Sequence, residues 1–114
     1  MDKIVTDIIL HKKSRLLEVI FASGECFQLS FEYLRVFSPS AEVRGHGMTK
    51  PKCVVGKEDI DIVAIEPVGN YGIKPVFDDG HNSGIFSWDM LYQLGVKHTA
   101  NWADYLARKQ YESR

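Results

Sequence analysis

The run IDIVAIEPVGNYGIKPVFDDGH, residues 60–81, has the pattern of two β-strands joined by a tight turn. Apolar and β-branched residues occupy 60 and 62–65 and recur in 71–77, and the turn-forming residues PVGN at 67–70 separate them. Proline has no backbone N–H, so Pro75 indicates that the second strand lies at a sheet edge or contains a bulge. The run therefore predicts an antiparallel hairpin.

The chain downstream of this hairpin predicts a short strand and then two helices. Asp79–Gly80 is a favourable hairpin turn that leads into a strand at 83–86. Ser87 is suited to cap a helix that Gly95 ends, and Thr99 is suited to cap a final helix. On this final helix, three large residues are expected to share one face: Trp102, Tyr105 and Leu106. We expect this face either to pack on the sheet or to bind a partner.

The chain upstream of residue 60 predicts three strands, one short helix and a long loop. Apolar residues alternate in three runs, 4–10, 17–21 and 27–29. Ser30 is suited to cap a helix at 31–37, and Pro39 ends it because proline disfavours the helical conformation of the preceding residue. Residues 38–58 have little periodicity and predict a loop.

These elements predict a single α+β domain. The 114 residues, 45% of them hydrophobic, have the size and composition of one globular unit. We expect an antiparallel sheet of about five or six strands with two or three short helices.

Composition excludes several classes of protein. The net charge of −1 does not favour electrostatic binding of nucleic acid or membranes. No apolar run approaches the roughly 18 residues of a membrane span, and the first residues do not resemble a signal peptide. We therefore expect a cytoplasmic protein whose two cysteines, Cys26 and Cys53, are reduced thiols.

The sequence lacks the motifs of the common catalytic sites. It contains no Walker A run, no G-x-G-x-x-G, no G-x-S-x-G and no H-x-[DE] pair of a facial iron triad. Asp78 and Asp79 are adjacent carboxylates, but a solvated hairpin tip does not provide the two different environments that acid–base catalysis needs. We expect no enzymatic activity.

Charge is distributed unevenly, which suggests where a binding surface lies. Residues 36–57 hold four basic residues against one acidic residue, a net +3, whereas 58–89 hold seven acidic residues against one lysine, a net −6. Either the basic loop lies over the acidic hairpins, or it binds an anion or an acidic partner. In the second case the glycine-flanked run Arg44–Gly45–His46–Gly47 offers backbone N–H groups and a guanidinium to an anion.

Three blocks of the sequence together resemble the DUF971 family, which is similar to the N-terminal domain of γ-butyrobetaine hydroxylase. The blocks are YLRVFSPSAEVRGHG at 33–47, IVAIEPVGNYGIKPVFDDGH at 62–81 and SGIFSWDMLYQLG at 83–95. The resemblance implies a bacterial protein with a family domain over 1–97 and a helical extension over 98–114. It also implies a link to iron–sulfur proteins, because a similar domain forms the C-terminal part of plant Mrp-type iron–sulfur scaffold ATPases.

The N-terminal domain of the hydroxylases holds a zinc ion through a Cys-x-Cys-x-x-Cys run and a later histidine. The resemblance therefore implies these four positions as the candidate zinc ligands in this chain. The cysteine positions correspond here to Ser38, Ser40 and Val43, and only the histidine remains, as His81. A structural zinc ion needs four good ligands, so this site is expected to be absent. A rebuilt site would have to draw on a different set of donors: His46, His81, Cys53, Cys26, Asp78 and Asp79.

We therefore expect a non-catalytic binding or adaptor domain without a cofactor, whose protein partner is an iron–sulfur scaffold ATPase or an oxygenase. Its candidate binding residues are Arg44, His46, Asp79 and His81. The alternative is a small zinc- or iron-binding protein, or an accessory to a separately encoded oxygenase, with His81 as the metal ligand. The sequence does not determine the oligomeric state.

Overall fold

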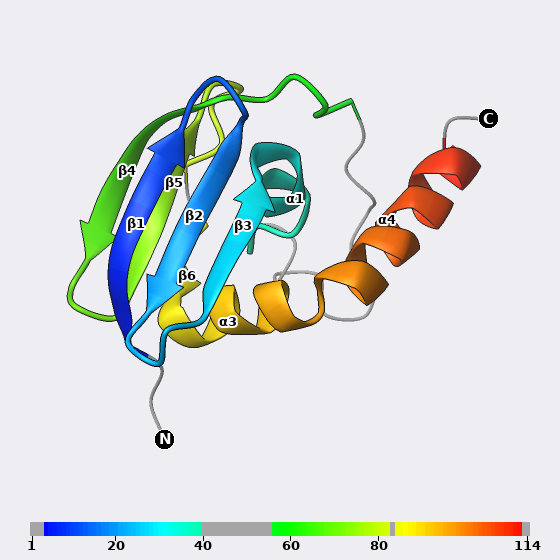
Figure 1. Cartoon of the computed structure of the whole chain (residues 1–114). Helices are drawn as coiled ribbons and strands as arrows, with labels where there is room; N and C mark the ends of the chain where they lie inside the picture. The colour runs from blue at the N-terminus through cyan, green and yellow to red at the C-terminus, as the bar shows by residue number, and fades with distance from the viewer. Residues whose placement is uncertain (1–3, 40–55, 83, 113–114) are drawn as a thin grey trace.

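The computed structural model describes residues 4–39, 56–82 and 84–112. Six strands and three helices lie in this part of the chain. In chain order they are β1 (Val5–His11), β2 (Leu16–Phe21), β3 (Cys26–Ser30), α1 (Phe31–Val36), β4 (Ile62–Val68), β5 (Gly72–Phe77), β6 (Phe86–Ser87), α3 (Trp88–Val96) and α4 (His98–Glu112). In Figure 1 the strands lie together on the left, α3 lies below them, and α4 lies beyond α1 on the right.

The strands form two sheets, whereas the sequence predicted one. Sheet A has the order β1-β2-β3 and sheet B the order β4-β5-β6, and all pairs are antiparallel. β3 and β4 are separated along the chain by α1 and do not pair, so the two groups of strands do not form a single ladder. An apolar sheet face must pack against a second layer. Two sheets can bury their apolar faces against each other, whereas a single sheet can bury its face only against helices. The α+β class is confirmed.

One core lies between these sheets and the helices. Alternation along β2 turns Leu17, Val19 and Phe21 into it. Sheet B and α3 contribute buried aromatic and aliphatic residues to the same cluster, which are Ile62, Ile73, Phe77, Phe86, Leu91 and Leu94. The two sheets and the helices therefore stabilise one another rather than forming separate units.

Pro75 was expected at a sheet edge or a bulge, yet β5 is the middle strand of sheet B. The pairing explains how the proline is accommodated. β6 reaches only Gly72 and Ile73 of β5, so Pro75 lies where β5 has a partner strand on one side alone. The turn predicted at 67–70 is also shorter, because β4 continues to Val68.

The predicted helix caps on α1 and α3 are confirmed, whereas Thr99, predicted to cap the final helix, lies inside it because α4 begins at His98. Ser30 Oγ accepts a hydrogen bond from the Tyr33 N–H at 3.0 Å, and Ser87 Oγ accepts one from the Met90 N–H at 3.1 Å. The predicted end of α3 at Gly95 is one residue early, because the helix continues to Val96. Gly95 has a packing role instead, since a Cβ atom there would overlap the Phe27 ring.

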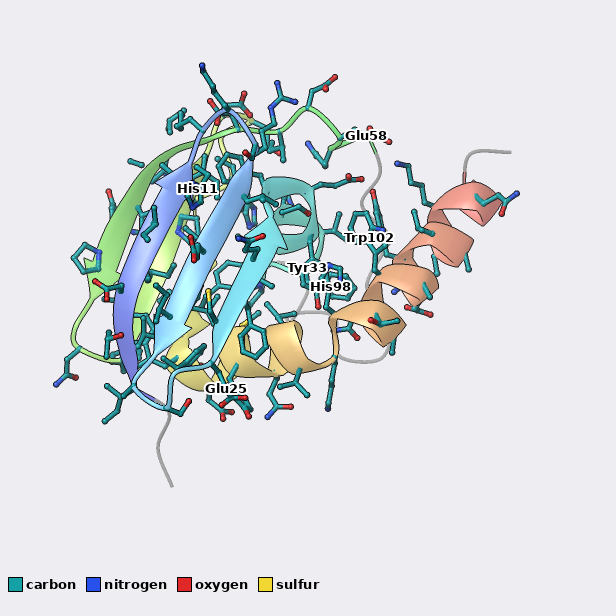
Figure 2. All side chains as sticks on the ribbon, in the orientation of Figure 1. His11, Glu25, Tyr33, Glu58, His98 and Trp102 are labelled. Atoms are coloured by element: carbon teal, nitrogen blue, oxygen red, sulfur yellow. The ribbon has the colours of Figure 1, made fainter. Side chains whose placement is uncertain are left out.

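Tyr33 joins the three helices. Its buried hydroxyl donates to the Leu94 carbonyl of α3 at 2.6 Å and accepts from Asn101 Nδ2 of α4 at 3.0 Å. Figure 2 shows Tyr33 beside His98 and Trp102, in the space between α1 and α4. The Tyr33 ring centroid is 4.6 Å from that of His98 and 6.0 Å from that of Trp102. Burial raises the pKa of Tyr33, so it stays a neutral hydrogen-bonding residue at physiological pH.

Helix α4 packs on α1. Of the three residues predicted to form its apolar face, Leu106 is largely exposed to solvent. Tyr105 is 1% exposed and donates to Glu32 Oε2 at 2.6 Å. Lys109 forms ion pairs with Glu32 and Glu58. Leu106, predicted to share the face of Tyr105, is 45% exposed, because successive residues of a helix differ by about 100° in direction. No helix in the described part of the chain is long and apolar enough to span a membrane.

The packing of α4 predicts that Tyr105→Ala lowers the free energy of unfolding by about 3 kcal/mol, because it removes a buried ring and leaves a cavity. Leu106→Ala is the matched control on the same helix, and we expect a change below about 1 kcal/mol because the side chain is largely exposed. Chemical denaturation of both variants checks this. Equal losses for the two substitutions would show that α4 is not docked through Tyr105.

Candidate functional site

The candidate site is built on the hairpin turn that follows β5. Two backbone hydrogen bonds close this turn, which consists of Asp78–Asp79–Gly80–His81. The Gly80 N–H donates to the Phe77 carbonyl at 3.2 Å, and the Phe77 N–H donates to the His81 carbonyl at 3.0 Å. Gly80 has φ +91°, a conformation that residues with a Cβ atom rarely adopt. The Asp79 carboxylate accepts the His81 N–H at 3.0 Å, which fixes the turn from inside.

Asp79 is held by two cations from distant parts of the chain. Its Oδ2 accepts Arg35 Nε at 2.8 Å from α1 and Lys57 Nζ at 2.6 Å from the segment before β4. All three side chains are largely buried, with 19%, 15% and 23% of the side-chain surface exposed for Asp79, Arg35 and Lys57. Burial alone would raise the pKa of Asp79, but hydrogen bonds from Lys57, the His81 N–H and Arg35 outweigh it and hold that pKa well below its usual range.

His81 connects the same hairpin to the end of α1. Its Nε2 lies 2.9 Å from Ser38 Oγ, two residues after the helix ends. Gly84 also lies against Ser38, since a Cβ atom on Gly84 would overlap the Ser38 side chain. The His81 ring also lies 6.0 Å from the Phe77 ring, which comes from the core. The imidazole is thus a partner of a hydroxyl in a packed corner of the fold.

The structure brings together two of the four candidate residues and adds three that the sequence did not single out as binding residues. Asp79 and His81 share the hairpin, whereas Arg44 and His46 lie outside the described residues, as do Ser40, Val43 and Cys53. The added residues are Arg35, Ser38 and Lys57. Of these three, only Lys57 is a charged residue of the basic loop whose charge is opposite to that of the hairpins, and Lys57–Asp79 is one direct contact between them.

The donors at this corner do not fit a structural zinc ion. Ser38 offers a hydroxyl at the position where the resemblance implies a thiolate, and the Asp79 carboxylate already neutralises two cations. A divalent ion placed there would be repelled by Arg35 and Lys57. Across the residues with described positions, no group of three histidine, cysteine or acidic side chains is arranged to hold a metal.

Asp78 and Asp79 have separate structural partners. Asp78 Oδ1 accepts the Asp61 N–H at 3.2 Å, and the Asp78 N–H donates to the Asp61 carbonyl at 2.9 Å. Lys12 in turn binds Asp61 Oδ2 at 3.0 Å. The two carboxylates therefore bind different neighbours and are not arranged as a pair around a shared proton.

We expect Asp79→Asn to lower the free energy of unfolding by about 2 kcal/mol at pH 7, because two charge-assisted hydrogen bonds lose their anion. Asp78→Asn, one residue earlier, leaves both cations on Asp79 in place and keeps an oxygen for the Asp61 N–H, so it should cost less than about 1 kcal/mol. Denaturant titration of each variant measures the difference. Similar costs for both variants would contradict a specific role of Asp79.

The same contacts predict how this difference varies with pH. A carboxylate whose pKa is lowered by folding stabilises the fold above its unfolded pKa, about 3.9. That contribution is lost as the pH falls through the folded pKa. The stability gap between the wild type and Asp79→Asn should stay constant from pH 7 to about 5 and narrow below about pH 4. A gap that narrows already between pH 7 and 6 would point to another group, such as a histidine.

Comparison with solved structures finds relatives over nearly the whole chain. One NMR solution structure is 48% identical with a TM-score of 0.84, covering 99% of this chain and 84% of that one. A second NMR structure is 43% identical with the same TM-score of 0.84, covering 98% and 88%. A crystal structure from Acidithiobacillus ferrooxidans, of a DUF971 protein of unknown function, is 36% identical with a TM-score of 0.64, covering 80% and 91%.

No curated protein matches the chain. The model of one family, described as gamma-butyrobetaine hydroxylase-like, N-terminal, matches residues 8–92, a range that holds the hairpin, α1 and both sheets apart from the start of β1. The chain therefore belongs to the gamma-butyrobetaine hydroxylase-like N-terminal family.

Proposed function

We propose that this chain is a non-catalytic adaptor domain that binds a protein partner through the hairpin Asp78–Asn82 and the segment that contains Arg44 and His46. The observation that carries the proposal is the anchoring of the residues on either side of that segment. Ser38 precedes it and bonds His81, while Lys57 follows it and bonds Asp79. Both flanks of the segment are thus tied to one hairpin, which favours a single combined surface.

The chemistry of this surface favours recognition over reaction. Asp79 and His81 have fixed partners, so they hold the hairpin in one conformation and reduce the entropy that binding would cost. Asp78 and Asn82 remain exposed on the hairpin and are available for polar contacts. A rigid turn with exposed polar groups suits a partner that offers complementary charges and hydrogen-bonding groups.

The partner that we propose is an iron–sulfur scaffold ATPase. The support is the family resemblance, because related domains form part of such ATPases in plants. A separately encoded oxygenase is the second partner class, supported by the likeness to the domain that precedes a hydroxylase.

The alternative function is a small zinc- or iron-binding protein with His81 as a ligand. The observation in its favour is that the remaining family histidine still faces the first of the former cysteine positions, Ser38. The two cations on Asp79 weigh against it. If it holds, bound metal disappears in His81→Ala; the adaptor proposal expects no stoichiometric metal in either protein.

Arg44→Gln should weaken binding of the scaffold ATPase of the same organism about tenfold or more, because a polar contact at an interface centre is lost, and it should leave the melting temperature unchanged. Lys97→Gln is the matched control, since it removes an exposed positive charge between α3 and α4, away from the hairpin. Titration calorimetry with the purified proteins measures both affinities.

Three results would reject the adaptor proposal as stated. The wild-type chain could fail to bind the ATPase, the two variants could lose affinity equally, or Arg44→Gln could unfold the domain. The last result would mean that the basic segment stabilises the fold rather than meeting a partner.

A further inference from the structure

The ion pairs of the hairpin and those of helix α4 join into one closed ring of alternating charge. Acidic and basic side chains from α1, α4, the hairpin and the residues just before β4 take part. The members of this charge ring, in order, are Asp79, Lys57, Glu58, Lys109, Glu32 and Arg35. Ion pairs form four of its links, and the other two run along the chain. Lys57 directly precedes Glu58, and Glu32 lies about one turn before Arg35 on α1.

Two consecutive residues connect the hairpin with helix α4. The side chain of Lys57 reaches the hairpin, whereas that of Glu58 reaches α4. In Figure 2, Glu58 lies between α1 and the upper part of α4. The backbone here is fixed, because Ile60 is buried in the core and its N–H donates to the Lys57 carbonyl at 3.1 Å. A change in the charge around one of the two side chains therefore acts on the other across a short and fixed distance.

The members of the charge ring are sheltered from solvent to different degrees. Glu58 is 49% exposed, and the other five side chains are between 15% and 24% exposed. The hydrogen bond between Lys109 and Glu58 raises the pKa of Lys109 and lowers the pKa of Glu58, so both groups are charged at neutral pH. Sheltered charges interact more strongly than fully exposed ones, so a member that loses its partner attracts the nearest opposite charge.

We propose that helix α4 controls the rigidity of the hairpin Asp78–Asn82 through the charge ring. While Lys109 is in place, the carboxylates of Glu32 and Glu58 have a cation of their own, so both cations on Asp79 stay at the hairpin. Without Lys109 the ring carries one excess negative charge, and the two carboxylates compete with Asp79 for its cations. The hairpin then loses part of the contact that fixes it.

The consequence for binding rests on the proposed adaptor function, in which this hairpin meets the partner. A fixed hairpin loses less entropy on binding, so docked α4 favours the partner and released α4 weakens its binding. Coupling between two sites is reciprocal, so a bound partner would in turn hold α4 in place. The coupling between α4 and the hairpin does not itself require a partner and is measurable in the chain alone.

Amide hydrogen exchange of the full chain at pH 7 tests this coupling. Lys109→Met removes the charge and keeps an unbranched apolar side chain. We expect the His81 amide, which is bonded to Asp79, to exchange about fivefold faster in this variant, at the lower end of the usual range for coupled sites. Lys97→Met is the matched control, because it removes an exposed cation between α3 and α4, and the His81 rate should not change. The Val19 amide in the core of β2 should exchange more slowly than that of His81 in each variant, because it reports on global unfolding.

Two further variants distinguish competition for charge from simple release of the helix. Adding Glu58→Gln to Lys109→Met removes one competing carboxylate, so the acceleration at the hairpin should fall from about fivefold to about twofold. Asp79→Asn frees two cations that then compete with Lys109, so by reciprocity the Tyr105 amide of α4 should exchange about fivefold faster. This second measurement decides the question even if Lys109→Met does not fold.

Four results would each overturn the proposal. They are an unchanged His81 rate in Lys109→Met, an equal acceleration in Lys97→Met, no rescue by Glu58→Gln, and an unchanged Tyr105 rate in Asp79→Asn. Failure of the wild-type chain to bind the scaffold ATPase is a different result, since it would reject the adaptor function and leave the coupling in place.

Discussion

The ion cluster around Asp79 joins parts of the chain that are far apart in sequence. A single carboxylate binds a guanidinium from α1 and an ammonium from the segment before β4, while its other oxygen fixes the hairpin after β5. Leaving any of these largely buried charges without a partner would be costly, so the three elements are held together as a set. The position of the candidate surface depends on this constraint, because the hairpin and both flanks of the basic segment converge on it.

A second set of contacts attaches the C-terminal helix. The buried hydroxyl of Tyr33 in α1 forms one hydrogen bond with α3 and one with α4. The Tyr105 hydroxyl in α4 donates a hydrogen bond to Glu32 in α1. These contacts cross from the family-matched residues 8–92 to a helix that begins at His98. A polar group buried at a helix interface requires partners, so these bonds also define how α1, α3 and α4 are oriented.

Local features of the fold could be predicted from sequence, whereas long-range ones could not. Ser30 and Ser87 were identified as caps because a cap is recognised within three residues. The division into two sheets depends on which strands pair across the long connection after α1, a choice that periodicity does not encode. Gly95 was interpreted as a helix end, because the Phe27 ring that requires a glycine there is distant in sequence.

In the candidate site, too, residues with a local sequence signal could be predicted and residues brought in by long-range contacts could not. Asp79 and His81 were found through the turn chemistry of Asp–Gly and the family pattern, and the structure places both in one polar corner. Arg35 and Lys57 were not identified as residues of the site. An ion pair between the hairpin and a distant segment leaves no local pattern in either part of the sequence. The imbalance of charge between the loop and the hairpins was a coarse sign of the Lys57 contact alone.

Amide hydrogen exchange of Gly80 and His81, measured once with a chelator and once with added zinc, tests most directly whether polar contacts rather than a metal hold the hairpin. Both amides are bonded within the turn, to the Phe77 carbonyl and to the Asp79 carboxylate. The account predicts equal protection under the two conditions and reduced protection in Asp79→Asn. Protection that appears only with zinc would contradict it and would favour the metal-binding alternative.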